Sequence, residues 1–264
     1  MLSDTTGSPF DVVGGLNITT SDNNPFSASL TIDAPLMAGD VCNVANICSG
    51  CTSTNHSDSF SLQGGELNIY GESNVTGKTI QGLVLNGGGN ILSGKLDINI
   101  GQLNNARCIH GFYFEYNTVK IGKSGESNDN LYFNIATGNT SSNSSIGHQC
   151  FAYRGALNQS TDSSGITYIY SGNLNFKAGY GYNWSVGCNA RYGFYMYGGV
   201  ANFASSDAYN RTYGLRTVST SQCIFIEGGT LNLSNGVSSQ GASSDYCGAV
   251  VSEYTSVNLG DVYS

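Results

Sequence analysis

The richest concentration of side chains that can bind a ligand lies between residues 180 and 213. This stretch holds seven of the seventeen tyrosines and the single tryptophan. Tyr and Trp offer a flat apolar face with a polar edge, a surface on which sugars stack and proteins dock. The predicted ligand-binding residues are Tyr180, Tyr182, Trp184, Tyr195 and Tyr197, with Arg191 beside them as a hydrogen-bond donor. Exposed tyrosine is also common on β-sheets that bind nothing, so both interpretations stay open.

A second group has the composition of a metal site. Cys42, Cys48, Cys51 and His56 lie within fifteen residues, and Cys48 and Cys51 have the two-residue spacing of a zinc knuckle. Zinc knuckles normally come as two such pairs, and this sequence has one. A local disulfide is therefore the favoured alternative to zinc at these residues.

The cysteine count as a whole favours an oxidising compartment. The chain has eight cysteines, an even number that suits disulfide pairing. Neighbouring repeats of a stacked β-structure are close enough for a disulfide, which makes Cys108 with Cys150, or Cys223 with Cys247, reasonable pairs. Buried free cysteine is the alternative.

Carboxylates that might do chemistry are scattered. Asp207, Glu227 and Asp245 fall on successive repeats and are the best candidates for a glycosidase pair, but nothing in their local sequence selects them. The loop Glu126–Asn130 has oxygen ligands that can hold calcium, although such a loop is more often a solvated turn. No histidine has a nucleophile motif around it, so no catalytic residue is assigned. A polysaccharide lyase or hydrolase is the least favoured functional class.

Composition excludes several partners. The chain has 264 residues, a formal net charge of −8 and only ten Lys and Arg, which argues against nucleic acid because nucleic acid requires a basic stripe. No apolar run approaches a membrane helix, so we expect no membrane insertion. The first residues lack the pattern of a signal peptide, and we expect the chain to be a fragment of an exported protein.

One ten-residue frame recurs along the sequence. It reads IFIEGGTLNL at 224–233, FSLQGGELNI at 60–69 and FYMYGGVANF at 194–203, with looser copies at 12–18, 92–98, 169–176 and 256–259. Two alternating runs around a Gly-Gly corner predict two short strands that meet at a bend. The Leu of the frame is expected at Leu67, Leu96, Leu131, Leu174, Ala201, Leu231 and Val257. Such recurrence is typical of a solenoid, whose repeats bury their apolar faces against their neighbours.

These repeats resemble those of right-handed parallel β-helix proteins of the pectin-lyase-like kind, in particular bacterial surface, adhesin and carbohydrate-binding repeats. The resemblance covers residues 59–264. It implies an all-β parallel β-helix of about seven or eight coils, each of roughly 26–30 residues. Residues 1–58, with a Cys-rich loop, break the rhythm and are expected to form an irregular N-terminal cap continuous with the coils.

The polar residue inside each frame is expected to face outward. These residues are Asn17, Asn68, Asp97, Asn175, Asn202, Asn232 and Asn258, and the prediction is a structural ladder of amide hydrogen bonds from coil to coil. A repetitive polysaccharide ligand for the same array is the alternative.

The function expected from these features is that of a non-catalytic extracellular or cell-surface protein, structural or adhesive, that can associate end to end. The first alternative is a carbohydrate-binding module with polysaccharide or a surface protein as its partner. No cofactor is assigned, calcium being admitted and zinc disfavoured.

Overall fold

The computed structural model describes residues 10–20, 28–34, 40–49, 59–72, 76–101, 106–115, 118–126, 130–155, 165–190, 192–217, 224–237, 249–251 and 255–259. The secondary structure of this part of the chain consists of strands, with no helix. The prediction of an all-β protein is therefore confirmed. The described residues contain no helix long and apolar enough to cross a membrane.

A seven-stranded sheet forms one side of the molecule. In spatial order, its strands are β1 (Phe10–Val12), β4 (Val41–Ile47), β6 (Thr79–Leu85), β8 (Cys108–Phe114), β11 (Gln149–Gly155), β14 (Trp184–Asn189) and β17 (Arg211–Arg216). Each neighbouring pair is parallel. These strands are rich in β-branched and aromatic residues, which favour the extended backbone.

A fourteen-stranded sheet contains two ladders of parallel strands. The first ladder contains β2 (Leu16–Thr19), the first part of β5 (Phe60–Gly71) and of β7 (Gly89–Ile100), β9 (Thr118–Ile121), β12 (Ile166–Ile169), β15 (Gly193–Met196), β18 (Ile224–Ile226) and β20 (Ala249–Val251). The second contains β3 (Ser29–Ala34), the remainder of β5 and β7, β10 (Leu131–Thr137), β13 (Asn173–Lys177), β16 (Val200–Ala204), β19 (Gly229–Ser234) and β21 (Thr255–Leu259).

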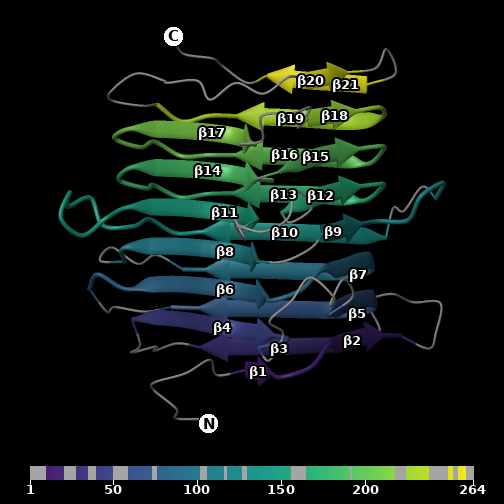
Figure 1. Ribbon diagram of the computed structural model, residues 1–264, viewed down its shortest axis with the longest axis horizontal. Coiled ribbons are helices and arrows are strands. Elements are labelled where there is room, and N and C mark those ends of the chain that lie inside the picture. The colour runs from purple at the N-terminus through teal and green to yellow at the C-terminus, as the bar shows by residue number, and fades with distance from the viewer. Residues whose placement is uncertain are drawn as a thin grey trace.

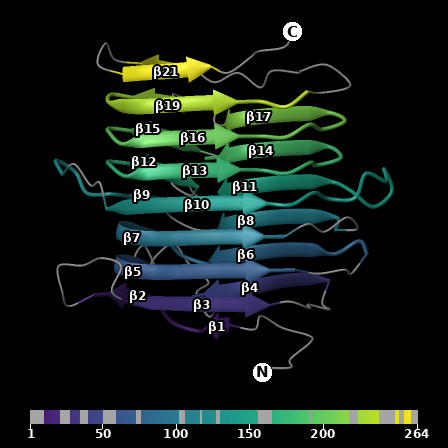
Figure 2. The ribbon, with the colours of Figure 1, turned by 180° about the vertical axis from the view of Figure 1, so that it is seen from behind.

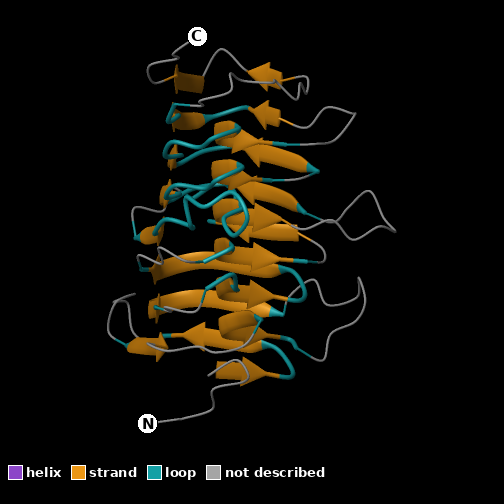
Figure 3. Cartoon of the chain, turned by 90° about the vertical axis from the view of Figure 1, so that its left-hand side faces the viewer, coloured by secondary structure: helices purple, strands orange, loops and turns teal. Residues whose placement is uncertain are grey.

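The chain visits the ladders in a repeating order. It passes through the first ladder, then the second ladder and then the seven-stranded sheet, as in β12, β13 and β14. We call one such passage a rung. Successive rungs lie above one another, and the two ends of the chain lie at opposite ends of the stack (Figures 1 and 2). Viewed from the side, the strands form superimposed layers joined by loops (Figure 3).

Corner glycines join the two ladders, as the frame predicts, although Gly94 and Gly172 follow Ser rather than a second Gly. Gly65, Gly94, Gly172, Gly199 and Gly229 all have positive φ. At Gly199 and Gly229, where φ is 83° and 92°, an added Cβ would lie only 2.7 Å and 2.6 Å from the carbonyl oxygen of the corner glycine on the preceding rung. Both the backbone conformation and the close stacking of rungs therefore require glycine here.

The core lies between the sheets and consists of aligned apolar side chains. Phe133, Phe176 and Phe203 follow one another on the second ladder, with ring centroids 4.8 Å and 4.9 Å apart. From the seven-stranded sheet, the buried Tyr153 stacks on Phe112 at 5.1 Å and on Phe176 at 5.2 Å. The Tyr153 hydroxyl lies 2.8 Å from the Thr167 hydroxyl, so its polar atom is hydrogen-bonded within the core.

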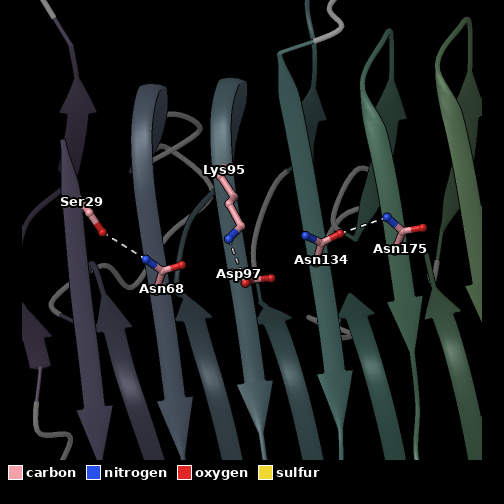
Figure 4. Close-up of polar contacts among 6 residues, drawn as sticks. All are labelled: Ser29, Asn68, Lys95, Asp97, Asn134 and Asn175. Carbon is pink, nitrogen blue, oxygen red and sulfur yellow. Dashed lines mark hydrogen bonds and ion pairs between the residues drawn. The ribbon is translucent and has the colours of Figure 1, made fainter. Parts of the chain in front are cut away.

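Most residues of the predicted asparagine ladder lie in register with one another. Asn68, Asp97, Asn175, Asn202, Asn232 and Asn258 occupy one column of the second ladder. Asn134 belongs to the same column, between Asp97 and Asn175, and the frame missed it. Nδ2 of Asn68 donates to Ser29 Oγ at 3.1 Å and Nδ2 of Asn175 donates to Asn134 Oδ1 at 3.0 Å, whereas Asp97 pairs with Lys95 at 3.3 Å (Figure 4).

Two positions of the frame were predicted wrongly. Leu131 aligns with Gly94, and Phe133 takes the place opposite Leu96, because a turn at 130 rather than a Gly-Gly pair introduces this strand. In the looser copy at 12–18, Asn17 lies opposite Ser61 on the first ladder. The column position of that rung is filled by Thr31, opposite Asn68.

The predicted disulfide between Cys108 and Cys150 is absent, since both are free cysteines. Cys150 pairs in register with Ile109, so Cys108 is one position out of register. Side chains alternate between faces along a strand, and Cys150 is buried whereas Cys108 is half-buried. Cys188 is also free. The pair Cys223 and Cys247 lies outside the described residues.

The strands before residue 59 continue the same sheets. β3 pairs with β5 and β4 pairs with β6, in the parallel orientation of the later rungs. Pairing therefore runs from the N-terminal region into the repeats without interruption.

Candidate functional site

A groove of about 430 Å³ opens at the corner between the two ladders. Its described lining consists of Gly125, Glu126, Tyr170, Ser171, Gly172, Asn173, Tyr197, Gly198, Gly199 and Val200. The corner glycines leave backbone as the floor of the groove, and the tyrosines form a wall. A cavity of this size with a few polar groups falls in the range of small-molecule sites.

Five aromatic rings form an outward-facing panel beside the groove. We use the name aromatic panel for Tyr168, Tyr170, Tyr195, Tyr197 and Phe225. The rings of Tyr168 and Tyr195 are stacked at 5.0 Å, and those of Tyr170 and Tyr197 at 5.3 Å. Phe225 extends the panel, 6.2 Å from Tyr195 and 5.9 Å from Tyr197. Their spacing follows that of neighbouring strands, about 4.8 Å.

The panel arises from alternation along β12, β15 and β18. Phe194 and Met196 are fully buried, so Tyr195 between them points outward, as predicted. Tyr197 follows β15 and is 39% exposed. Tyr195 aligns with Tyr168 and Phe225 on the adjacent strands. The sequence analysis identified Tyr195 and Tyr197 and missed Tyr168, Tyr170 and Phe225. The sequence signal for these three residues was their position in the frame. Tyr168 and Phe225 lie as far before the corner glycine of their own rung as Tyr195 does, and Tyr170 lies as far before it as Tyr197 does.

The aromatic panel ends at the rung of Tyr170 and does not continue onto the preceding rung. Ile121, Ile169 and Met196 align on successive strands. The residues that directly follow these three are Gly122, Tyr170 and Tyr197. Gly122 packs against Ser171, the residue after Tyr170, because an added Cβ at Gly122 would meet the Ser171 side chain and backbone. On the rung of Gly122, Gly125 and Glu126 line the groove.

The described lining of the groove has one carboxylate, that of Glu126, and no Lys or Arg. Lys123 forms an ion pair with Glu126, with 3.5 Å between Nζ and Oε2. Burial, then the neighbouring Tyr170 and then Glu227 raise the pKa of Tyr197. The pKa of Tyr168 is raised by burial and by the neighbouring tyrosines. The phenols therefore stay protonated at neutral pH and can both donate and accept hydrogen bonds.

The other predicted ligand-binding residues lie elsewhere. Trp184 is on the seven-stranded sheet, with the Arg216 guanidinium 4.2 Å from its ring centroid and that of Arg211 at 5.6 Å. Tyr182 stacks on Tyr209 at 5.0 Å in the segments that precede β14 and β17. Tyr180, Tyr182 and Trp184 therefore do not share a face with Tyr195 and Tyr197, because they belong to different sheets and corners. Arg191 lies outside the described residues.

A buried polar cluster on the seven-stranded sheet surrounds His110. Nε2 of this fully buried imidazole accepts from Arg154 Nη1 at 2.7 Å, and its Nδ1 is 2.9 Å from the Gln81 amide. Arginine can only donate, so a neutral His110 carries its proton on Nδ1. The Gln81 atom at this 2.9 Å contact is Nε2, so the Gln81 amide must turn to present its oxygen to that proton. Burial first, and then the Arg154 charge, hold the pKa of His110 well below its usual range.

The proposed metal ligands are only partly described. Cys42 is buried in β4, while Cys48 follows the strand and is disulfide-bonded. Cys51 and His56 lie outside the described residues. Within the part of the chain that the structure describes, no three His, Cys, Asp or Glu side chains come together to hold a metal ion.

The candidate carboxylates occupy different corners. Asp207 follows β16 and its Oδ1 accepts from the Val237 backbone N–H at 2.8 Å. Glu227 follows β18, between the two ladders. Glu227 therefore lies where the strands of the second ladder begin, and Asp207 lies where they end. Asp245 lies outside the described residues.

Comparison with protein-family models, curated proteins and solved structures gives no match for this chain.

Proposed function

We propose that this chain is a non-catalytic parallel β-solenoid, of about eight coils of roughly 26–30 residues, that serves as a structural or adhesive element outside the cell. The observation that carries this proposal is the asparagine ladder. Asn232 donates to Asn202 at 2.6 Å and Asn202 donates to Asn175 at 2.7 Å. Side-chain hydrogen bonds that run along a stack reinforce it against bending and shear.

Parallel pairing at both ends of the stack supports end-to-end association. β2 and β3 at one end, and β20 and β21 at the other, run in the same direction as the strands they pair with. A second copy placed on either end would continue both ladders without reversing polarity. Such a head-to-tail contact uses two different surfaces and produces open filaments rather than closed dimers.

The separation of the candidate carboxylates supports a non-catalytic role. Glycoside hydrolysis requires two carboxyl groups within about 5–9.5 Å of each other. Asp207 and Glu227 lie beyond opposite ends of the strands of the second ladder. Asp207 already accepts a backbone hydrogen bond. The extracellular setting rests on the resemblance to surface repeats and on the even count of eight cysteines, of which Cys48 is disulfide-bonded.

Analytical ultracentrifugation with negative-stain microscopy, across protein concentration, tests this function. Rods that lengthen with concentration are the expected result, in the presence and absence of reductant. A particle that stays monomeric at all concentrations would contradict end-to-end assembly. Breakdown of a polysaccharide by the purified chain would contradict the non-catalytic role.

A further inference from the structure

We infer that the groove beside Tyr170 and Tyr197 binds a neutral saccharide chain. This inference rests on the proposed function and deepens it, because it names the ligand class through which an adhesive solenoid would attach. Three features carry it: an aromatic ring in the wall of the groove, a backbone floor and the local charge.

The ring of Tyr170 is the stacking platform. Tyr197 covers one of its faces at 5.3 Å, with an angle of 10° between the ring planes. Tyr170 lines the groove together with Gly125 and Glu126 of the preceding rung. A ligand that occupies the groove can therefore reach the Tyr170 ring. Pyranose rings present a row of C–H groups on one side, which pack on such a ring.

Hydrogen-bonding groups surround this platform. Asn173 has a side-chain amide that can both donate and accept hydrogen bonds, and Glu126 has a carboxylate that can accept hydrogen bonds from hydroxyl groups. Gly172, Gly198 and Gly199 expose backbone rather than side chains to the floor, which allows a ligand to approach their N–H and C=O groups closely. A neutral sugar carries many hydroxyl groups that match this mixture of donors and acceptors.

The charge of the site selects against acidic sugars. Lys123 is already paired with Glu126, and Glu227 lies close enough to Tyr197 to affect its pKa. The described lining residues include no Lys or Arg. A uronate or sulfated chain would therefore find no Lys or Arg among the described lining residues to neutralise its charge, whereas a neutral chain needs none.

The remaining panel extends the site beyond one sugar unit. Tyr168 lies 6.3 Å from Tyr170, and Tyr195 stacks on Tyr168. Because these rings stack on one another, their edges and hydroxyl groups rather than their faces border the solvent. Hydroxyl groups on successive rungs can bond to successive units of an oligosaccharide.

Isothermal titration calorimetry with cellohexaose, mannohexaose and hexagalacturonate tests the inference. At least one neutral hexasaccharide is expected to bind, and hexagalacturonate at least tenfold more weakly. Tyr170→Ala and Tyr197→Ala should each weaken the neutral ligand about tenfold, the value of one good stacking contact. Gly125→Asn fills open space at the groove with a residue that tolerates positive φ, and should weaken it similarly without removing a ring.

Tyr209→Ala is the matched control. Tyr209 is 39% exposed, as is Tyr197, and it belongs to an equally close stacked pair with Tyr182, but it does not line the groove. Its loss should change affinity less than twofold. Binding of neither neutral hexasaccharide, or an equal loss in Tyr209→Ala, would overturn the inference. If the chain forms rods but binds no hexasaccharide, the inference fails and the proposed function stands. If shortened oligosaccharides are found in the titrated sample, only the non-catalytic role is contradicted.

Discussion

Asn202 donates from Nδ2 to Oδ1 of Asn175 across 2.7 Å, while the backbones of the same two residues are paired in register on β16 and β13. Asn202 also accepts from Asn232 at 2.6 Å. One side chain thus connects three rungs, in addition to the backbone hydrogen bonds of the sheet.

Replacing Asn202 by Ala is expected to lower the free energy of unfolding by about 1–2 kcal/mol, because two hydrogen bonds are lost at a half-buried position. Chemical denaturation measures the change. Asn99→Ala is the control, since Asn99 is exposed on β7 and outside the ladder column. Equal destabilisation by both substitutions would show that the ladder contributes no more than strand propensity.

Gly199→Ala should destabilise the chain far more than Gly77→Ala. Both glycines have positive φ, 83° and 75°, so both substitutions carry a similar backbone cost of about 1 kcal/mol. A Cβ at Gly199 also meets Gly172 O at 2.7 Å, whereas at Gly77 nothing lies within 4 Å. We expect about 1–3 kcal/mol more from this overlap, measured as the difference between the two unfolding free energies. A difference near zero would mean that the corner relaxes.

Acidification should destabilise the fold through His110. Its pKa is lowered in the folded chain by burial and by Arg154, so the folded state stays neutral while the unfolded state binds a proton below pH about 6.5. The contribution is therefore complete above that pH and is lost as pH falls, by up to about 1.4 kcal/mol per pH unit.

The measurement is the slope of unfolding free energy against pH between 7 and 5.5, in the parent chain and in His110→Gln. The slope should be smaller in the variant, in which the residue at 110 no longer titrates. His148, whose pKa is also lowered by burial and then by Arg107 and Arg154, remains in both chains. Identical slopes would show that His110 is not the group responsible.

Thiol labelling should distinguish Cys108 from the buried Cys150 and Cys188. Burial raises the pKa of Cys150 to about 12 and that of Cys188 well above its usual range. The thiolate is the reactive form, so at pH 8 iodoacetamide should modify the half-buried Cys108 first. Cys150 and Cys188 should react only after unfolding, as followed by peptide mass spectrometry. Labelling of Cys150 in the folded chain at the rate of Cys108 would contradict this packing.

The sequence alone determined the strands, the Gly-Gly corners and most of the asparagine column. These features depend on local alternation and on glycine at positive φ, so they are legible in a single repeat. Leu67 and Leu96, or Asn202 and Asn232, align as their spacing predicts. Asn134 was not predicted because its rung reaches the second ladder through a longer loop. The longer loop changes the sequence spacing from the neighbouring asparagines but not the register of the strands.

The grouping of side chains on the surface was decided only by the tertiary structure. Trp184 and Tyr195 are eleven residues apart in the sequence, yet they lie on different sheets because the chain turns between them. Tyr168 and Tyr195 are much farther apart in sequence and stack at 5.0 Å. Neighbours in a stacked fold are residues one rung apart, so which rings share a face depends on the register between rungs and on loop lengths that composition does not reveal.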